Sequence, residues 1–415
     1  MKDTLLIKNI GELVTCSGFT SKKGSEMKEL HTLHNVSILI EKGIIKEIIN
    51  SPQPKAISEK DIEIIDAMGS SVLPGFVDSH THFIFSGYRE EEFYLRFQGT
   101  SYMDIMKAGG GIANSVNKTR AASKEELVQL GKKRLDDMLS MGITTLEGKS
   151  GYGLDLDTEM CQLEAMRTLN EAHAVDIVST FLGAHALPKE YSGRKKEYID
   201  FIIHKVLPVV KNRNLAEFCD VFCEKNVFEI EESRYLLEEA KKLGFKLKLH
   251  ADEIVAIGGT ELACELGAVS ADHLLQASDK GIKALANSST IATLLPCTAF
   301  SLKEDYARGR EMIDAGCAVA LATDFNPGSC FTHSIPLLIA LACYNMNLSL
   351  EEVITALTIN GAAALNREKH IGSIDVNKEA DLIILKYPSY KFLLYNLGMN
   401  VVSKVIKRGI LVKTN

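Results

Sequence analysis

Short apolar runs alternate with amphipathic stretches through the middle of the chain. Residues 318–322 form one such run, and residues 245–249 form another in which apolar and lysine side chains alternate. Runs of this length suit β-strands, and strands that alternate with helical stretches predict a parallel sheet with crossover helices. We count eight such strands, which end near His80, Glu147, His185, Glu224, His250, His273, Pro296 and Asp324.

The segment that begins at residue 123 is the clearest predicted helix. Ser123 supplies an N-cap, and Glu126 three residues later completes a capping box. An apolar stripe at helical spacing follows and comprises Leu127, Leu130, Leu135 and Met138. Gly142 ends this helix, and similar patterns predict helices over residues 231–243 and 350–365.

The two ends of the chain have a different pattern. The first ~66 residues contain short β-type runs such as 36–40 and 45–49, separated by polar turns. Residues 380–385 and 401–406 return to that pattern near the other end. We therefore expect one small β-sandwich domain built from both termini.

The middle of the chain predicts an α/β barrel. Eight strand–helix units over roughly 300 residues are typical of a (β/α)8 TIM-type barrel with insertions. We expect the barrel to occupy residues 67–361 and the composite β-sandwich domain to combine residues 1–66 with residues 362–415. In such barrels the active site lies at the C-terminal ends of the strands.

Candidate metal ligands fall at these strand ends. An apolar run at residues 71–79 leads into His80-Thr81-His82, and alternation along a strand points both imidazoles the same way. His250 and Asp324 each follow a later apolar run. An HxH pair alone is a weak signal. Three imidazoles and one carboxylate at the ends of separate strands are a strong one, because imidazole suits Zn, Fe, Cu or Ni and a catalytic Zn typically has three protein ligands and an open position for water.

A metal ion at these residues would activate water and polarise a carbonyl oxygen. Asp324 can both bind the ion and hold a proton of the attacking water. Glu253, His273 and His185 lie at or just past strand ends, where each could serve in general acid–base catalysis.

Each of these residues also has a structural interpretation. Asp324 alone could cap a turn through residues 325–328, and Glu253 alone could be a first-turn helix acid. The shared position at strand ends favours the functional interpretation. We assign surface or core roles to the histidines that end no barrel strand, namely His31, His34, His173, His204, His333 and His370.

Composition narrows the class of protein. A net charge of −7 argues against a sequence-independent nucleic-acid binder, which needs a basic face. No run approaches ~18 consecutive apolar residues, and residues 1–9 do not have the pattern of a signal peptide, so we expect no membrane association. Nine cysteines without framework spacing favour reduced thiols and a cytoplasmic location. Cys219 and Cys223 could form a metal pair, but their segment is more typical of a buried strand.

With these residues the chain resembles the amidohydrolase superfamily. The superfamily pattern comprises residues 73–82, His250, His273, Asp324, residues 371–375 and residues 380–382. A narrower match within the superfamily comprises residues 86–93, 101–102, 109–112, 147–154, 183–186 and 323–329. Together these segments span nearly the whole chain, and residues 86–93 and 147–154 are its most specific parts.

This resemblance implies a reaction and a cofactor. The implied reaction is hydrolysis of the cyclic amide of 4-imidazolone-5-propanoate to N-formimidoyl-L-glutamate in histidine degradation. The implied cofactor is one Zn²⁺ or Fe³⁺ ion per subunit of a homodimer. Its ligands would be His80, His82, His250 and Asp324.

The resemblance also implies roles for residues around the metal. Arg89 would pair with the propanoate, whose carboxylate matches the planar guanidinium fork. The other implied substrate contacts are Tyr152, His185, Glu253, Asn326, Gly328 and Ser329. The implied catalytic residues, which position water and move protons, are Glu253, His273 and Asp324. Ser329 stands where the family often has threonine, and it keeps the hydroxyl group.

Alternatives remain for two charged residues. Arg89 could form a surface ion pair with Glu90, Glu91 or Glu92. We expect a single metal ion, because two-metal relatives usually carry a modified lysine at the fourth strand, and here that strand ends in Phe222-Cys223-Glu224. Lys149 lies at the second strand, and we interpret it as a substrate-side or structural residue.

Two other functions share part of the pattern. A related amidohydrolase could deaminate a purine or a pyrimidine, and Arg89, Tyr152 and residues 147–154 separate the chain from that class. A non-catalytic metal-binding scaffold is the other alternative. The intact Glu253, His273 and Asp324 argue against it.

Overall fold

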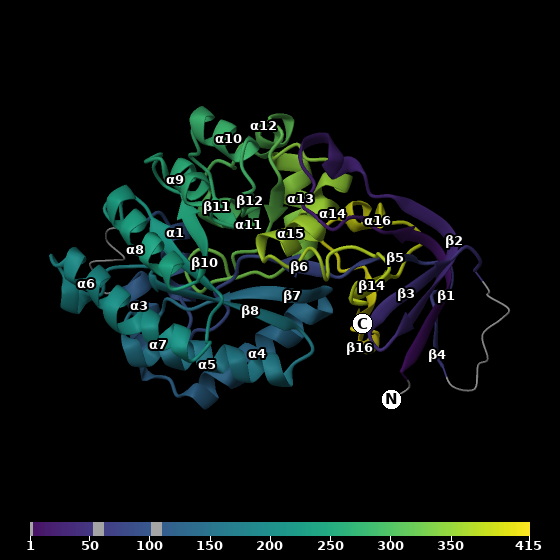
Figure 1. Ribbon diagram of the computed structural model, residues 1–415, viewed down its shortest axis with the longest axis horizontal. Helices are drawn as coiled ribbons and strands as arrows, with labels where there is room; N and C mark the ends of the chain where they lie inside the picture. Colours follow the sequence, from purple (N-terminus) through teal and green to yellow (C-terminus); the bar gives the residue numbers. More distant parts are fainter. Residues whose placement is uncertain (1–2, 53–61, 101–109) are drawn as a thin grey trace.

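The molecule has a barrel at one end and a separate sheet at the other (Figure 1). The computed structural model describes residues 3–52, 62–100 and 110–415. Ser101, Tyr102 and Gly109 of the narrower sequence match lie outside these ranges. Within them, no helix is both long enough and apolar enough to cross a membrane.

Eight parallel strands form the barrel and follow one another in sequence order around it. They are β6 (Phe76–Asp78), β7 (Ile143–Lys149), β8 (Asp176–Ala184), β9 (Phe218–Cys223), β10 (Lys246–Ala251), β11 (Ser270–His273), β12 (Ile291–Leu294) and β13 (Val319–Leu321). The ring closes just beyond β6 and β13. There the N–H of Asp324 donates to the carbonyl of His80 over 3.0 Å, and the N–H of His82 donates to Phe325 over 2.9 Å. The predicted (β/α)8 barrel is therefore confirmed.

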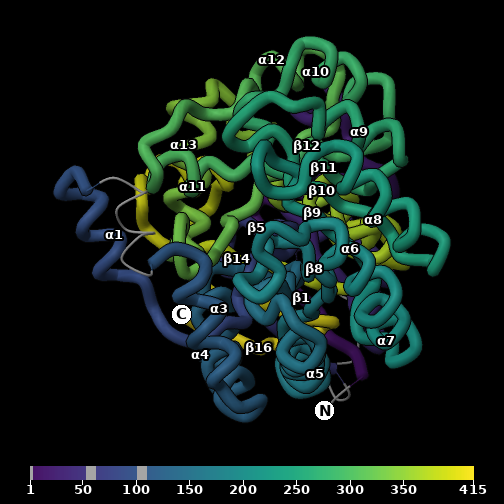
Figure 2. The backbone as a smooth tube through the Cα atoms, turned by 90° about the vertical axis from the view of Figure 1, so that its left-hand side faces the viewer, coloured from purple at the N-terminus to yellow at the C-terminus, as the bar shows by residue number. Residues whose placement is uncertain are grey.

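Helices surround the barrel strands (Figure 2). The helices after the first three barrel strands are α1 (Glu90–Phe97), α3 (Ile112–Ala121), α4 (Lys124–Ser140), α5 (Leu156–Ala172), α6 (Lys195–Phe201) and α7 (Leu207–Asn212), with the short turns η3 (Lys189–Tyr191) and η4 (Ile202–Val206). Those that follow are α8 (Ile230–Lys242), α9 (Gly259–Leu266), α10 (Asp279–Ala286), α11 (Pro296–Leu302), α12 (Gly309–Asp314), α13 (Ile335–Asn345), α14 (Leu350–Leu357) and α15 (Ile359–Ala364). The capping box of α4 is present, because the Ser123 hydroxyl accepts from the N–H of Glu126 over 3.2 Å.

The single helix predicted over residues 350–365 is wrong in one respect. The structure has two helices there, because Thr358 leaves the helical region with φ −124° and ψ −97°. The Thr358 hydroxyl donates to the carbonyl of Ile354 over 2.6 Å at this break. Beyond this change of direction α15 contacts β6, β12 and β13, whereas α14 contacts β6, β13 and the segment Gly24–Lys28.

Strands from both ends of the chain form the second sheet. Its hydrogen-bonded order is β16 (Ile410–Thr414), β15 (Val402–Lys407), β14 (Leu382–Leu385), β5 (Ser71–Pro74), β1 (Thr4–Val14), β2 (Thr32–Glu41) and β3 (Ile44–Ile49), with β4 (Glu63–Asp66) also paired to β1. The turn η1 (Gly24–Lys28) and the helix α16 (Phe392–Tyr395) flank these strands in sequence. The separate terminal sheet expected from the sequence is thus present.

Both faces of β14 in this sheet are buried, and its side chains alternate between two apolar clusters. On β14, Leu382 and Ile384 join the apolar cluster of the sheet itself. Ile383 and Leu385 join the large cluster of the barrel. The sheet therefore packs directly against the barrel.

The chain passes from one sheet to the other at Gly75. Strand β5 pairs with β14 of the terminal sheet, and β6 on the other side of Gly75 pairs with β7 of the barrel. A Cβ atom at Gly75 would lie 2.4 Å from the Thr144 side chain, so the close approach requires glycine. The division into residues 1–66, 67–361 and 362–415 stays a prediction, and β5 is a strand of the terminal sheet that lies within the central range.

Candidate metal and substrate site

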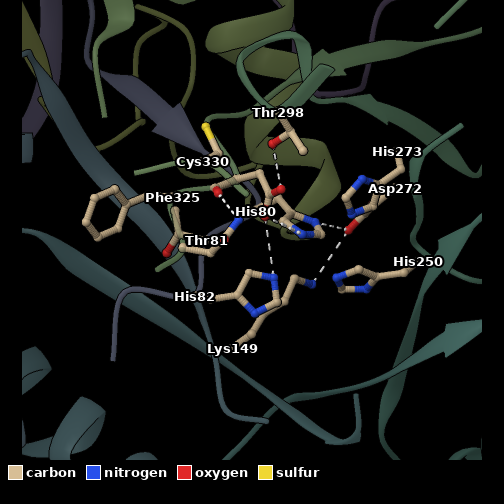
Figure 3. Close-up of polar contacts among 12 residues, drawn as sticks. His80, Thr81, His82, Lys149, His250, Asp272, His273, Thr298, Phe325 and Cys330 are labelled. Atoms are coloured by element: carbon tan, nitrogen blue, oxygen red, sulfur yellow. Dashed lines mark hydrogen bonds and ion pairs between the residues drawn. The ribbon is translucent and has the colours of Figure 1, made fainter. Parts of the chain in front are cut away.

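Four buried imidazoles meet at the C-terminal ends of the barrel strands (Figure 3). His80 and His82 follow β6, His250 lies in β10, and His273 ends β11. The ring centroid of His80 is 5.3 Å from that of His82, 4.6 Å from that of His250 and 5.3 Å from that of His273. The structure thus brings together residues that the sequence places on three separate strands.

Asp324 adds a carboxylate to these imidazoles. Its Oδ1 lies 3.6 Å from Nε2 of His80 and 3.6 Å from Nε2 of His82, and its Oδ2 accepts from the Thr298 hydroxyl over 2.6 Å. The backbone of Asp324 has φ 52°, a left-handed conformation that aspartate adopts more readily than most residues other than glycine.

The donor set fits a metal ion. Ligand atoms of His80, His82 and Asp324 all lie within 4.8 Å of one another, and so do those of His80, His250 and His273. The Nε2 atoms of His80, His250 and His273 are buried and have no hydrogen-bond partner among the described residues. Burial also lowers the pKa of His80, His82 and His273, which keeps these imidazoles neutral, as a metal ligand must be.

The predicted ligands His80, His82, His250 and Asp324 all belong to this group. His273, for which we predicted a proton-transfer role, lies as close to His80 as His82 does. Its Nδ1 is 3.5 Å from Oε1 of Glu253. Burial and the nearby Asp324 carboxylate raise the pKa of Glu253 to about 8. Glu253 thus lies beside the His273 imidazole of this cluster.

One cavity of about 740 Å³ opens onto this cluster. Of the predicted site residues, it is lined by His82, Arg89, Tyr152, His185, His250, Glu253, His273, Asp324, Asn326, Gly328 and Ser329. His80 is fully buried behind them. The cavity therefore places three of the four candidate metal ligands, His82, His250 and Asp324, on one continuous surface with the candidate substrate contacts.

Arg89 lies in the cavity wall and is also paired with an acid. Its Nε donates to Oε2 of Glu92 over 2.8 Å, and the two side chains are only 14% and 13% exposed. The pairing with Glu92 considered from the sequence is present, but it is largely buried. The other end of the guanidinium faces Gly328, where a Cβ atom would lie 2.1 Å from Nη1. Glycine at position 328 therefore leaves room for this arginine.

Tyr152 and His185 continue the wall beside His82. The rings of His82 and His185 stack with centroids 5.1 Å apart, and His185 is 5.4 Å from Tyr152. Burial lowers the pKa of His185 to about 3, and burial raises the pKa of Tyr152. Both rings are thus uncharged at neutral pH and can exchange neutral hydrogen bonds with a ligand.

The loop that carries Tyr152 is held by a buried acid that no sequence pattern had indicated. Glu159 of α5 accepts from the backbone N–H groups of Gly151, Gly153 and Leu154 over 3.2, 2.9 and 2.9 Å. A carboxylate in the first turn of the helix that follows a glycine-rich loop was the available signal.

Asn326 shapes the turn after β13. Its Oδ1 accepts from the N–H groups of Gly328 and Ser329, both over 2.8 Å. Its Nδ2 donates to the carbonyl of Asp324 over 2.7 Å. These contacts are those of a side chain that folds its own turn, and they hold Asp324, Gly328 and Ser329 at the cavity.

Two carboxylates behind the imidazoles were also missed. Nδ1 of His80 is hydrogen-bonded to Oδ2 of Asp272 over 2.7 Å, and Nδ1 of His250 lies 2.9 Å from Oδ2 of Asp220. Burial would lower the pKa of His250, but the Asp220 carboxylate outweighs it and the net shift is upward. Acids inside otherwise apolar strands were the signal for both residues.

Comparisons with known proteins show which family the chain belongs to. The model of the Amidohydrolase family matches residues 71–412. Among solved structures, a triazine hydrolase from Arthobacter aurescens superimposes with a TM-score of 0.77 at 16% identity, covering 100% of this chain and 95% of that one. An adenosine deaminase from Xanthomonas campestris with bound zinc gives 0.70 at 17% identity, covering 98% and 92%. At these identities the likeness concerns the fold alone.

The family model matches most of the chain, and the chain therefore belongs to the amidohydrolase family. Sequence relatives narrow the membership. An imidazolonepropionase from Clostridium tetani is 60% identical over 409 residues, which cover 98% of each chain. Another from Bacteroides thetaiotaomicron is 57% identical over 418 residues, covering 100% of each. Within the amidohydrolases, the chain belongs to the imidazolonepropionases.

Proposed function

We propose that this hydrolase opens the ring of 4-imidazolone-5-propanoate to give N-formimidoyl-L-glutamate, a step of histidine degradation. The observation that carries the proposal is that Arg89 and three imidazoles of the cluster, those of His82, His250 and His273, line the same cavity. An imidazolone with a propanoate side chain has a cyclic amide at one end and a carboxylate at the other. The cavity offers a complementary group for each end.

We assign the metal ligands to His80, His82, His250 and Asp324. One Zn²⁺ or Fe³⁺ ion held there would supply Lewis acidity for the attack of water on the ring carbonyl. Zn and Fe both accept this donor set, so the choice between them rests on metal analysis. We further propose one ion per subunit of a cytoplasmic homodimer.

The chain's own residues would carry the proton. Water adds to the ring carbonyl carbon, the carbon–nitrogen bond breaks, and the departing ring nitrogen takes up a proton as the new carboxylate forms. Glu253, with a pKa raised to about 8, can accept and return a proton near neutral pH. His273, 3.5 Å away, can orient that carboxyl group, and Asp324 can accept a hydrogen bond from the water.

Arg89 would bind the propanoate, and the neighbouring polar groups would hold the ring. Tyr152 and His185 are neutral and stand beside His82, where they can contact the ring or its substituents. Asn326, Gly328 and Ser329 would line the far side of the ligand. Glu253 would contact the ring as well as the water.

The decisive experiment is a direct assay of ring opening. Loss of the ultraviolet absorbance of 4-imidazolone-5-propanoate would be followed with the purified protein loaded with Zn²⁺ or Fe³⁺. A purine and a pyrimidine would be run alongside to test deamination. Turnover of the imidazolone alone is expected, whereas release of ammonia from either base without imidazolone turnover would overturn the proposal.

A further inference from the structure

Five charged side chains form a buried layer behind the imidazole cluster. Three are acids and two are lysines, and each side chain has 0% exposure: Glu147, Lys149, Asp220, Lys248 and Asp272. They come from β7, β9, β10 and β11. We call this set the charged layer.

Lys149 is the centre of the charged layer. Its Nζ lies 2.6 Å from Oδ2 of Asp220, 3.0 Å from Oε2 of Glu147 and 3.6 Å from Oδ2 of Asp272. Burial would lower the pKa of Lys149, but Asp220 and Glu147 outweigh it, so the amine keeps its proton. Lys149 does not line the cavity, which excludes the substrate-side role considered from the sequence.

Lys248 supports the same acids from the neighbouring strand. Its Nζ lies 2.9 Å from Oε2 of Glu147 and donates to the carbonyl of Ser79 over 2.9 Å. It is 3.8 Å from Oδ2 of Asp272. Ser79 directly precedes His80, so this lysine also fixes the backbone that carries the first candidate ligand.

The acids of the layer contact the candidate ligands on the side away from the cavity. Oδ2 of Asp272 and Oδ2 of Asp220, the oxygens nearest the lysines, are also those nearest Nδ1 of His80 and His250. The other oxygens are held locally, because Oδ1 of Asp272 accepts from Ser270 over 2.6 Å and Oδ1 of Asp220 accepts from the N–H of Val221 over 2.7 Å. Neither carboxylate can turn away from its imidazole without losing these contacts.

A buried charged layer needs a reason other than fold stability. Removing several charges from water is unfavourable, and well-packed apolar side chains of the same volume are often at least as stable. The three acids and two lysines leave one net negative charge next to the imidazoles, which favours a cation in front of them. Acceptors at Nδ1 also orient ligand imidazoles and fix their tautomer.

We propose that Lys149 and Lys248 are positioning residues for the metal: they hold Asp220 and Asp272 against Nδ1 of His250 and His80, so that each Nε2 faces the ion without a proton. This inference rests on the proposed metal site. It gives a role to Lys149, which has no part in the proposed reaction although it belongs to the segment 147–154.

Lys149→Met tests the inference with metal ions alone, without substrate. Zn²⁺ affinity would be measured by competition with a chromophoric chelator, and the visible spectrum of the Co²⁺-loaded protein would report the ligand geometry. We expect Zn²⁺ binding to weaken by about ten- to a hundredfold, as is usual when such supporting contacts are lost. We also expect a changed Co²⁺ spectrum.

Lys407→Met is the matched control. Lys407 is a buried lysine with two acid partners, Asp381 at 2.5 Å and Asp176 at 2.7 Å, at the contact between barrel and terminal sheet. Its loss should lower the melting temperature and leave the Zn²⁺ affinity and the Co²⁺ spectrum unchanged. If Lys149→Met does not fold, Lys248→Met takes its place. Lys248 has one acid partner closer than 3.5 Å, whereas Lys149 has two, so its loss should destabilise the fold less.

The outcomes separate the inference from the proposed function. Wild-type metal affinity and an unchanged Co²⁺ spectrum in the folded lysine variant would make the layer a purely structural device and overturn the inference alone. An equal loss of affinity in Lys407→Met would do the same, because it would show a general effect of stability. A wild-type protein that binds neither Zn²⁺ nor Co²⁺ would overturn the proposed metal site and this inference together.

Discussion

Glu92 holds Arg89 by its Nε, over 2.8 Å, and leaves the terminal nitrogens of the guanidinium directed to the cavity wall at Gly328. Glu92 also accepts from the N–H of Gly111 over 2.9 Å and from Asn114 over 2.7 Å. One carboxylate thus ties α1 to the start of α3 and fixes the direction of the arginine. In the proposed complex, the substrate carboxylate would meet the terminal nitrogens of Arg89.

Arg89→Ala should remove a charge-assisted contact to the propanoate and leave metal binding intact. Such hydrogen bonds contribute roughly 1.5–3 kcal/mol, so kcat/KM should fall by about tenfold or more. Arg89→Lys should recover only part of the loss, because an ammonium cannot reproduce the fork. Steady-state kinetics on a substrate analogue without the carboxylate is the control, and there the variant should lose little. Equal losses on both substrates would contradict the assignment.

Glu92→Ala should raise KM while kcat changes less, because the arginine loses its orientation and the reacting groups are untouched. Glu92→Gln keeps an acceptor oxygen, so its KM should lie between those of Glu92→Ala and the wild type. Kinetic constants for the two variants, measured at one pH and metal content, test this order. An unchanged KM in Glu92→Ala would mean that the arginine is oriented by other contacts.

Asp324→Ala should nearly abolish turnover of any substrate, since it removes both a metal ligand and an acceptor for water. Thr298→Val is the milder companion, because it removes only the 2.6 Å hydrogen bond to Oδ2. One lost hydrogen bond to a charged group costs about 1.5–3 kcal/mol, so an intermediate activity is expected. Metal content measured on the same samples shows whether the loss follows the ion. Full activity in Asp324→Ala would reject its role as ligand.

Glu159→Ala should loosen the loop that carries Tyr152, because three backbone N–H groups lose their acceptor. Unsatisfied buried donors cost about 1–3 kcal/mol each. We expect a lower melting temperature and a raised KM, with metal affinity retained. Calorimetry, kinetics and metal titration would measure these effects. A loss of metal affinity equal to the loss of activity would show that the loop supports the metal rather than the substrate.

Asp375 should stabilise, in a pH-dependent way, the contact between the loop after β1 that contains Ser17 and Gly18 and the segment before β14. Burial would raise its pKa, but hydrogen bonds from Ser17, Ser373 and the N–H of Gly18 outweigh it and lower the pKa. The stabilisation is therefore present above the unfolded pKa of about 3.9 and is lost as pH falls through the lower folded value. Asp375→Asn should lose about 1 kcal/mol at pH 7.

Chemical unfolding of Asp375→Asn and wild type over a pH series checks this expectation. The difference between the two proteins should be constant near neutral pH and should shrink in acid below about pH 4. A difference that grows in acid would have the wrong sign for a carboxylate whose pKa folding lowers.

The strand ends and the polar residues that follow them could be predicted, because both are local patterns. The run before His80 and the helix capped by Ser123 are each encoded within about ten residues, and the structure has both. The break at Thr358 was not predictable, because the helical pattern of residues 350–365 is continuous and only packing on three strands divides it. Tertiary contacts decide such points.

The charged layer was beyond local patterns for the same reason. Asp272 and His80 are 192 residues apart in sequence, and Asp220 and Lys149 are 71 apart. Each acid or lysine by itself looked like an irregularity in an apolar strand. Their contacts with one another and with the imidazoles form only when the barrel brings the strands together.

The passage of the chain through Gly75 connects the terminal sheet directly to the strand that precedes His80. Five residues beyond Gly75 lies His80, and no flexible linker intervenes, because β5 is paired on one side and β6 on the other. We expect a shift of β14 against β5 to displace the backbone that carries the His80 imidazole. A variant without the terminal strands would retain every candidate ligand residue, but it would lose the strand pairing that fixes the position of His80.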